Sequence, residues 1–253
     1  MKDVGRKSYP YMEEVNEALL RHERDLPRRS RVLDVGCGRG ALAAAMAERG
    51  HEVWGVENAP EAVAVARTRL HRVLAHDLLD VDAVVADAGG ARFDAIVFSD
   101  VLEHVYDPRT VIERYAALLT PRGRLLISVP NAVVWEQRVR VLLGRFRYDD
   151  TGLMDRTHIR FFTRETLREL VEAGGYRIDV EDADPHLVRA ALPLLKKTIL
   201  RGGGDSTDKG ARGIIDSPAY RMYLRAVYPW ERALAARLPG LLAFRLVAVA
   251  HKL

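Results

Sequence analysis

Hydrophobic and polar residues alternate along this chain with two different periods, and the change of period marks the predicted elements. Compact runs of β-branched and aliphatic residues predict buried strands, whereas apolar residues that recur every three or four positions predict helices with one buried face. Strands are predicted over residues 31–35, 52–56, 73–78, 93–99, 124–129, 176–180 and 243–250, with a turn over 119–123. Helices are predicted over 11–26, 41–49 and 60–70, from Asp107-Pro108 onward, and from Thr163 to Gly174-Gly175.

This alternation of strands and helices is typical of an α/β fold whose parallel sheet is covered by helices on both faces. In such doubly wound folds, right-handed crossovers place ligands at the carboxyl ends of the strands. Two segments interrupt the alternation: 132–160, which is rich in arginine and aromatic residues, and 185–240. We expect a single domain over 1–253, made of an N-terminal helix in 1–30, a core in 31–184 and 241–253, and a helical insertion or lid in 185–240.

A glycine-rich turn follows the first predicted strand directly and precedes an alanine-rich helix. Strand, glycine turn and helix together let a ligand approach bare backbone at a helix N-terminus. Gly36, Gly38 and Ala41 also fit the relaxed dinucleotide fingerprint G-x-G-x-x-G/A, so a nicotinamide-dependent dehydrogenase is an alternative. Asp34 argues against that alternative, because dinucleotide-binding sites commonly carry an apolar residue at this position.

Three stretches of the sequence are similar to a known enzyme family. The stretch Leu33-Asp-Val-Gly-Cys-Gly-Arg-Gly40 resembles motif I of the class I methyltransferases that use S-adenosylmethionine. Phe93–Val105, which ends in Leu-Glu-His-Val, and Arg122–Asn131 resemble the O-methyltransferases of ubiquinone biosynthesis, and the dehydrogenase alternative does not account for them. The resemblance covers about residues 30–182 and 243–252. It implies a Rossmann-like sheet of seven strands, mostly parallel, with an antiparallel last strand.

The resemblance implies that S-adenosylmethionine is the cofactor and that strand ends hold it. Glu57 lies 21 residues after Gly36, where a carboxylate can accept both hydroxyls of an adenosyl ribose. Asp77 matches a position that often contacts the adenine amino group. The expected cofactor-binding residues are Asp34, Gly36, Cys37, Gly38, Gly40, Glu57, Asn58, Asp77, Leu78, Ser99 and Asp100.

Asp100, Glu103 and His104 follow the fourth predicted strand at spacings of three and four, so they share one face if the segment is helical. Carboxylate and imidazole groups arranged in this way can hold a divalent cation, which makes these residues candidate metal ligands. The ubiquinone relatives tend to carry glutamate where this chain has Asp100. We therefore expect a polar helix start beside the cofactor and no metal.

His158 lies in a polar segment, Leu153–Thr163, and similar Asp-x-x-His segments occur in the same methyltransferase group. Neutral imidazole is suited to take a proton from an acceptor hydroxyl near pH 7, so His158 is the predicted general base. Asp155 is a candidate to orient its ring, and His104 is the competing base. The alternative for His158 is a capping or packing role.

Arginine and aromatic side chains interleave in the segment 132–160, at Trp135, Arg138, Arg140, Arg145, Phe146, Arg147 and Tyr148. Arginines suit phosphate or carboxylate groups, so we expect an anionic acceptor such as a nucleotide- or lipid-linked sugar, or a natural product. Trp135, Arg138, Tyr148 and Arg160 are the predicted substrate residues. Residues 187–201 read as an amphipathic helix, for which packing on its own domain is favoured over membrane docking.

The composition of the chain excludes some classes of protein but does not indicate a function. The 48% apolar content is typical of a globular protein, and Cys37, the single cysteine, excludes an internal disulfide framework. The first residues lack the apolar core of a signal peptide, so we expect a cytoplasmic enzyme. The net charge of +4 comes without a nucleic-acid-binding signature. Methyl transfer to nitrogen or carbon, and a protein that binds the cofactor without catalysis, are the other functions considered. The sequence does not indicate an oligomeric state.

Overall fold

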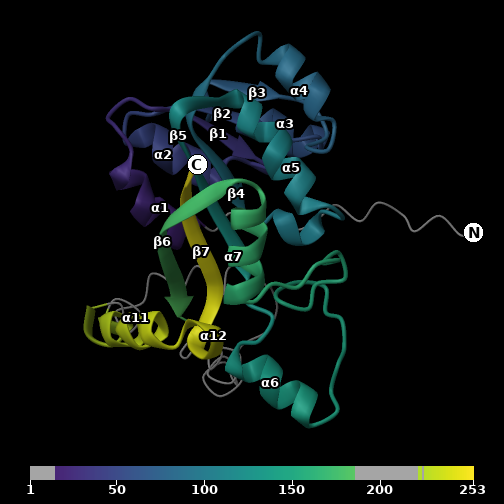
Figure 1. Cartoon of the computed structure of the whole chain (residues 1–253), viewed down its shortest axis with the longest axis vertical. Coiled ribbons are helices and arrows are strands. Elements are labelled where there is room, and N and C mark those ends of the chain that lie inside the picture. The colour runs from purple at the N-terminus through teal and green to yellow at the C-terminus, as the bar shows by residue number, and fades with distance from the viewer. Residues whose placement is uncertain (1–14, 186–221, 224) are drawn as a thin grey trace, which may run out of the picture.

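The computed structural model describes residues 15–185, 222–223 and 225–253, and it contains one seven-stranded sheet flanked by helices (Figure 1). The strands are β1 (Arg31–Val35), β2 (Glu52–Val56), β3 (Arg72–Leu74), β4 (Phe93–Ser99), β5 (Leu119–Pro130), β6 (Tyr176–Pro185) and β7 (Ala243–Lys252). The helices are α1 (Glu17–His22), α2 (Ala41–Glu48), α3 (Pro60–Ala66), α4 (Val81–Asp87), α5 (Pro108–Tyr115), α6 (Trp135–Leu142), α7 (Arg164–Ala173), α11 (Tyr228–Arg237) and α12 (Pro239–Leu242). Short 3₁₀ turns cover Glu23–Asp25, Leu102–His104 and Ala116–Leu118.

The strand order is β3-β2-β1-β4-β5-β7-β6. The first five strands pair in parallel, and β7 is antiparallel to both of its neighbours, β5 and β6. Val35 at the end of β1 pairs with Val56 of β2 and Phe98 of β4, so the carboxyl ends of these strands meet at one edge. The doubly wound fold and the antiparallel last strand are both confirmed. This edge of the sheet is where such folds bind ligands.

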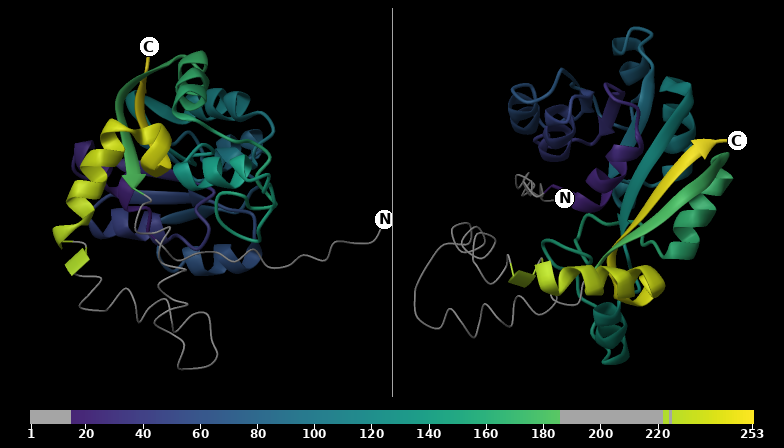
Figure 2. Two further views of the ribbon diagram at one scale, coloured as in Figure 1. Left: turned by 90° about the horizontal axis from the view of Figure 1, so that it is seen from below. Right: turned by 90° about the vertical axis from the view of Figure 1, so that its left-hand side faces the viewer.

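Helices cover both faces of the sheet, as the alternating pattern predicts (Figure 2). On one face the buried side chains of α1, α2 and α3 pack on the sheet, and Leu19, Met46 and Val63 belong to this core. On the other face α4, α5 and α7 pack with a larger group of strand residues that includes Phe98 and Ile127. Burying both faces requires strands without polar alternation, which is why β1 and β4 read as continuous apolar runs.

The helix starts predicted at Asp107-Pro108 and at Thr163 are confirmed. Asp107 accepts a hydrogen bond from the backbone N–H of Thr110, and Pro108 occupies the first helical position of α5. Thr163 caps α7 in a reciprocal capping box with Thr166. None of the described helices combines the length and the hydropathy that crossing a membrane requires.

Several predicted boundaries were wrong. β3 ends at Leu74, so Asp77 lies beyond the strand and not in it. Residues 119–123 belong to β5 and not to a separate turn, because Leu119 pairs with Phe93 and the register shifts before Ala95 pairs with Arg124. That irregularity accommodates the proline and glycine that indicated a turn.

Other elements were shorter, longer or missed. α3 ends at Ala66 rather than at residue 70, and β6 continues to Pro185. The short helices α4 and α6 were not predicted. Within the predicted helix over 11–26, residues 17–22 are helical and the 3₁₀ turn Glu23–Asp25 follows, while 11–14 lie outside the described residues. The predicted helix over 187–201 also lies outside the described residues.

Candidate active site

A cavity of about 550 Å³ opens at the carboxyl ends of β1, β4 and β5 and at the start of β7. Its volume is in the range of sites that hold small molecules and cofactors. The described residues that line it are Asn16, Asp34, Gly36, Cys37, Gly38, Arg39, Ala41, Leu42, Leu78, Ser99, Asp100, Val101, Glu103, His104, Pro130, Thr151, Gly152, Asp155, Thr157, His158, Phe244 and Arg245.

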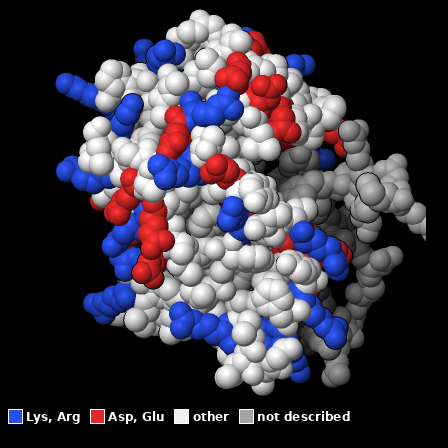
Figure 3. Space-filling model, turned by 45° about the vertical axis from the view of Figure 1, so that its right-hand side comes forward, with Lys and Arg blue, Asp and Glu red and all other residues white. Residues whose placement is uncertain are grey.

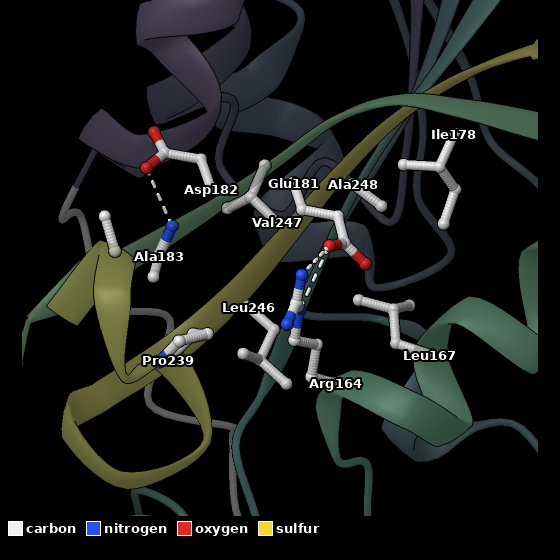
Figure 4. Close-up of a pocket in the computed structure, with 11 residues that line it drawn as sticks. Arg164, Leu167, Ile178, Glu181, Asp182, Ala183, Pro239, Leu246, Val247 and Ala248 are labelled. Atoms are coloured by element: carbon white, nitrogen blue, oxygen red, sulfur yellow. Dashed lines mark hydrogen bonds and ion pairs between the residues drawn. The ribbon is translucent and has the colours of Figure 1, made fainter.

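A second, much smaller pocket of about 40 Å³ lies between α7, β6, β7 and α12 (Figure 4). The carboxylate of Glu181 points toward Arg164 there and also accepts hydrogen bonds from Arg168. The pocket is too small for a cofactor, and its charged groups satisfy one another. We interpret it as a small gap left where α11 and α12 pack against β6 and β7.

The glycine turn forms one wall of the large cavity. Gly36, Gly38 and Gly40 adopt left-handed backbone conformations with φ of 73°, 54° and 78°. At Gly36 a Cβ atom would lie 2.8 Å from Cγ2 of Val101, so a side chain is excluded there by contact as well as by conformation. The turn therefore exposes backbone to the cavity, as the motif predicts.

Asp34 is the buried acid at the end of β1, with 2% of its surface exposed. Its Oδ1 atom has no hydrogen-bond partner in the described part of the chain, although the residue lines the cavity. Burial, followed by the nearby carboxylate of Glu57, raises the pKa of Asp34 to about 7. A cationic ligand group placed in the cavity would give this carboxylate its missing partner and favour its ionised form.

Glu57 lies at the end of β2 and is also buried. Its Oε2 accepts from the backbone N–H of Gly38 at 3.0 Å, and its Oε1 accepts from the N–H groups of Asn58 and Ala59. Glu57 thus holds the glycine turn against β2, a role that the sequence analysis did not include.

Asn58 and Asp77, two of the predicted cofactor-binding residues, lie next to one another. The Asn58 side-chain amide donates to Asp77 at 3.0 Å, and the other oxygen of Asp77 accepts from the N–H of Leu79. Leu78 lines the cavity, but Glu57, Asn58 and Asp77 are not among its described lining residues. The cavity therefore reaches the glycine turn and Leu78, which directly follows Asp77 in the chain.

Cys37 is buried in the glycine turn, and burial raises the pKa of its thiol well above the usual range. A Cβ atom on Gly55 would lie 2.5 Å from its Sγ atom, so the thiol packs closely against β2. A thiol held neutral in this way is a poor nucleophile. Cys37 is a small packing residue of the turn.

Asp100 lines the cavity and belongs to a network of polar contacts that joins Asn16, Ser99, Asp100, Ser128 and Arg245. We call these residues the cavity floor. Asp100 adopts a left-handed conformation with φ of 52°, and its carboxylate accepts from Ser128 Oγ at 2.8 Å and from Arg245 Nε at 2.5 Å. The side-chain amide of Asn16 donates to Ser128 and to Ser99. The premise that Asp100 shares a helical face with Glu103 and His104 was wrong, because only Leu102–His104 form a 3₁₀ turn.

Two of these floor residues were missed by the sequence analysis. Arg245 is a largely buried arginine that directly precedes the apolar run Leu246–Ala250 of β7, and its unusual setting was a usable signal. Asn16 caps α1, because its side-chain oxygen accepts a hydrogen bond from the N–H of Leu19. A capping residue is ordinary in sequence, so nothing there indicates that its side-chain NH₂ group donates to Ser128. Both reach the site only through the fold.

Glu103, His104 and His158 also line the cavity and come together, and their ligand atoms lie within 4.8 Å of one another. Glu103 is 1% exposed, and neither of its carboxyl oxygens has a hydrogen-bond partner in the described part of the chain. Burial, followed by nearby Asp100, raises the pKa of Glu103 well above its usual range. This group, and not the predicted set that included Asp100, has the donor atoms for a cation.

The two imidazole rings pack edge to face with centroids 4.8 Å apart. Nδ1 of His158 lies 2.9 Å from the carbonyl oxygen of Leu153, and because a carbonyl can only accept, this nitrogen carries the proton. In the neutral ring Nε2 is therefore an acceptor, and it lies 4.0 Å from Glu103 Oε1. Burial, followed by His158, lowers the pKa of His104.

Asp155 does not orient the ring of His158, contrary to the prediction. Its Oδ1 accepts from both the backbone N–H and the hydroxyl of Thr157 instead. The orienting group is the carbonyl of Leu153, five residues before the histidine. Every residue carries a backbone carbonyl, so the sequence does not show which one will accept a hydrogen bond from the histidine ring.

The predicted substrate residues Trp135, Arg138, Tyr148 and Arg160 are not among the described lining residues. Arg138 donates to the carbonyls of Val133 and Gly240, and Arg160 donates to the carbonyl of Tyr106. Tyr148 is exposed and packs on the edge of Phe146. In this structure none of these four side chains is among the described residues that line the cavity, and Arg138 and Arg160 donate to backbone carbonyls instead.

A family model described as a methyltransferase domain matches residues 6–180, which is more than half of the chain. The chain belongs to the methyltransferase domain family. It is of the class I, S-adenosylmethionine-dependent type, and the dehydrogenase alternative is excluded.

Curated relatives of this methyltransferase include ubiquinone biosynthesis O-methyltransferases. The protein from Xanthomonas axonopodis pv. citri is 42% identical over 139 residues, which cover 49% of this chain and 57% of the relative. The protein from Idiomarina loihiensis is 40% identical over 105 residues, covering 40% of this chain and 42% of the relative. The match thus spans about half the length of these relatives.

Solved structures share the fold of this methyltransferase. A SAM-dependent methyltransferase from Archaeoglobus fulgidus has a TM-score of 0.56 at 18% identity, with 92% of each chain covered. The 1,6-didemethyltoxoflavin N1-methyltransferase from Burkholderia thailandensis has a TM-score of 0.54 at 22% identity, covering 94% of this chain and 77% of the other. At these identities the likeness establishes the fold alone.

The cavity of the methyltransferase fits S-adenosylmethionine at one end. The unpartnered Oδ1 of Asp34 can accept from the amino group of the methionine moiety, and the glycine turn gives that moiety room against bare backbone. Glu57 lies at the adjoining strand end, next to the glycine turn to which its carboxylate is hydrogen-bonded. These residues match the charge and hydrogen-bonding groups of the cofactor.

Proposed function

We propose that this methyltransferase transfers a methyl group from S-adenosylmethionine to a hydroxyl of a small-molecule acceptor. The observation that carries the proposal is one cavity lined by two chemically different groups of residues. One group is the unpartnered Asp34 with the glycine turn, and the other includes His158, which has an acceptor nitrogen at Nε2. The printed names of the curated relatives support oxygen as the methylated atom.

S-adenosylmethionine supplies a methyl group that its sulfonium already activates. The residues of this chain then have two tasks, which are to align the acceptor and to remove its proton. We propose that Nε2 of His158 takes the proton from the acceptor hydroxyl while the oxygen attacks the methyl carbon and the carbon–sulfur bond breaks. The Leu153 carbonyl fixes the tautomer that this step requires.

His104 is the competing base. Its Nδ1 lies 3.2 Å from the carbonyl of Thr157, so this ring also presents Nε2 as an acceptor in its neutral form. We propose His158 as the base because it is the more buried of the two, which protects the proton transfer from water. His104 is then the neighbour that packs against the base and shares its side of the cavity.

The charge of the lining bears on the acceptor. Asp34, Asp100, Glu103 and Asp155 line the described cavity, whereas Arg39 and Arg245 are its cationic side chains. Arg245 is already paired with Asp100. An anionic acceptor, such as a nucleotide- or lipid-linked sugar, therefore stays a prediction that rests on the arginines of 138–147. The residues that line the described cavity give more support to a neutral acceptor that carries a hydroxyl. Carboxylates near the acceptor end also suit an amine, which keeps methyl transfer to nitrogen as the second candidate.

The test is turnover with isotopically labelled cofactor against a panel of matched acceptors. We expect methyl transfer to neutral phenols or alcohols, detected by mass spectrometry of the product. His158→Ala should bind S-adenosylhomocysteine with unchanged affinity and lose turnover. Methyl transfer to amines but to no hydroxyl would replace the oxygen assignment, and cofactor binding without turnover on any acceptor would contradict the proposed activity.

A further inference from the structure

The charged side chains inside this methyltransferase are more informative than those on its surface. Lys and Arg atoms lie beside Asp and Glu atoms over the upper part of the face in Figure 3, which is typical of a solvated surface. Arg245 differs, because its side chain is only 14% exposed and the residue lines the cavity. A largely buried arginine is uncommon unless it has partners, and these partners determine what it can still bind.

The partners of Arg245 use only part of its hydrogen-bonding capacity. A guanidinium has five N–H donors. Its Nε donates to Asp100, whereas Nη1 lies 3.9 Å from Oδ2 of Asp184, which is beyond hydrogen-bond distance. Among the described residues, neither Nη1 nor Nη2 has a hydrogen-bond acceptor. The N–H groups of both terminal nitrogens are therefore available to a ligand in the cavity.

The sheet topology separates Arg245 from the predicted cofactor-binding residues. Asp34 ends β1 together with the glycine turn, and β4 and β5 lie between β1 and β7. Neighbouring strands are about 4.8 Å apart, so three strand spacings separate the backbones of Arg245 and Asp34 by on the order of 14 Å. Arg245 pairs instead with Pro130 of β5, which also lines the cavity. A ligand group at Arg245 therefore belongs to the acceptor and not to the methionine moiety of the cofactor.

The surroundings of Arg245 are unfavourable for an anionic ligand group. Burial lowers the pKa of its guanidinium, but nearby carboxylates raise it by more, and these belong to Asp100, Asp184 and Glu103. An anion at this position would meet several acids beside one cation. A neutral oxygen fits better, because arginine only donates hydrogen bonds and an ionised donor makes stronger ones than a neutral donor does.

A chain of hydrogen bonds fixes Asp184 on the other side of Arg245. The hydroxyl of Tyr228 in α11 donates to Asp184 Oδ1 at 3.2 Å and accepts from Arg21 Nη1 at 3.2 Å. Arg21 also donates to Asp182. Figure 1 shows α11 close to the place where β6 ends and β7 begins. A hydroxyl of α11 therefore sets the position of a carboxylate that faces Arg245.

We propose that Arg245 binds a neutral, hydrogen-bond-accepting oxygen of the acceptor and so contributes to the choice of acceptor. This role rests on the proposed methyl transfer to a hydroxyl, and it adds a second polar group to the acceptor. The bound group is a carbonyl, ether or hydroxyl oxygen that accepts from Nη1 or Nη2 while Nε stays on Asp100. Tyr228 is a positioning residue, because it acts on Arg245 through Asp184.

The test compares phenol with the three isomers of methoxyphenol, each of which adds one oxygen that can only accept. For the parent protein we expect kcat/KM with at least one isomer to exceed that with phenol about tenfold or more, the effect of one hydrogen bond from a charged donor. Arg245→Lys keeps a cation that can pair with Asp100 but lacks the planar fork, so it should lose most of this preference. A loss of stability alone would lower both rates alike and leave their ratio unchanged.

Tyr228→Phe tests the positioning role, because it removes only the hydroxyl that holds Asp184. It should lower the preference for the methoxyphenol about threefold. Tyr223→Phe is the matched control, since the ring of Tyr223 packs against that of Tyr228 but its hydroxyl donates to Glu231. The control should keep the parent ratio, and each variant should bind S-adenosylhomocysteine as the parent protein does.

The outcomes separate the role of Arg245 from the proposed activity. Turnover of phenol without any preference for a methoxyphenol overturns the role of Arg245, as does an equal ratio in the parent protein and in Arg245→Lys. If none of the four phenols is methylated, their transfer reaction is contradicted, and calorimetry of the same phenols with the S-adenosylhomocysteine complex decides on Arg245. Tighter binding of a methoxyphenol that Arg245→Lys loses then supports its role, and equal binding of all four overturns it.

Discussion

The guanidinium of Arg245 donates to the carboxylate of Asp100 across 2.5 Å, although the two residues lie 145 positions apart in the chain. Arg245 also lies 3.9 Å from Asp184, so one cation from β7 faces two acids from the ends of β4 and β6. The pair fixes the last strand of the sheet against the cavity floor. Its geometry leads directly to a stability prediction.

Replacing Arg245 with methionine should lower the free energy of unfolding by about 3 kcal/mol, because the change leaves Asp100 and Asp184 without their cation in a largely buried setting. Urea unfolding followed by circular dichroism measures this change. The double variant Asp100→Asn/Arg245→Met should recover part of the loss, since it removes one uncompensated charge. A loss below about 0.5 kcal/mol for Arg245→Met would mean that the pair is no stronger than a surface ion pair.

Cofactor affinity should depend on the ionisation of Asp34, whose pKa is raised to about 7. A cationic amino group binds the ionised carboxylate, so Asp34 must release a proton when the ligand binds below that pH. The affinity for S-adenosylhomocysteine should therefore fall between pH 8 and pH 6, by at most about tenfold per pH unit below the pKa. Calorimetry at the two pH values measures the difference.

Asp34→Asn is the control for that pH dependence. The amide cannot ionise, so its weaker binding should be nearly flat between pH 6 and pH 8. The same raised pKa has an opposite effect on the ligand-free protein: the folded state holds the proton more tightly than the unfolded state, so stability falls as pH rises from about 4 to about 7. A parent protein that binds equally well at pH 6 and pH 8 would remove Asp34 from the cofactor site.

Glu57→Ala should weaken cofactor binding by about 1.5–3 kcal/mol, because buried donors lose a charged acceptor. The structure adds a second reason, since the variant also releases the N–H of Gly38 and loosens the glycine turn. Calorimetry gives the affinity, and Glu57→Gln, which keeps an acceptor oxygen, should lose less. Unchanged affinity in a folded Glu57→Ala protein would exclude Glu57 from ribose binding.

His158→Ala should lower kcat by roughly 10²–10⁴-fold, the range for loss of a general base, while S-adenosylhomocysteine binds as before. His104→Ala should have the smaller effect, since its proposed role is to pack beside the base. Steady-state rates from pH 6 to pH 9 test both variants. Full activity in His158→Ala together with near-abolition in His104→Ala would transfer the role of base to His104.

Most of the residues that we expect to hold the cofactor could be identified from local sequence patterns. A strand that ends in Asp34, a turn that needs three left-handed glycines and a second strand that ends before Glu57 are each recognisable from neighbours in sequence. Their spatial relation follows from topology, because adjacent parallel strands end at one edge. The exact bounds of β5 did not follow, since Leu119 and Gly123 take strand positions only through their contacts with Phe93.

The surroundings of His158, the proposed base, could be determined only from the tertiary structure. His158 was identifiable as a candidate, but its partners Leu153 and Glu103, and the separation of Glu103 from Asp100, depend on how a loop packs on the 3₁₀ turn. The arginines of 138–147 read as a substrate wall in the sequence and lie outside the described cavity lining in the structure.

The sequence by itself determined the α/β fold, the glycine turn and the acids at the strand ends, because periodicity and turn geometry are properties of neighbouring residues. Only the tertiary structure decided that Arg245 and Asn16 belong to the cavity floor and that the arginines near α6 face outward. Contacts between residues more than a hundred positions apart leave no mark in local pattern, because they arise when separate elements pack against one another.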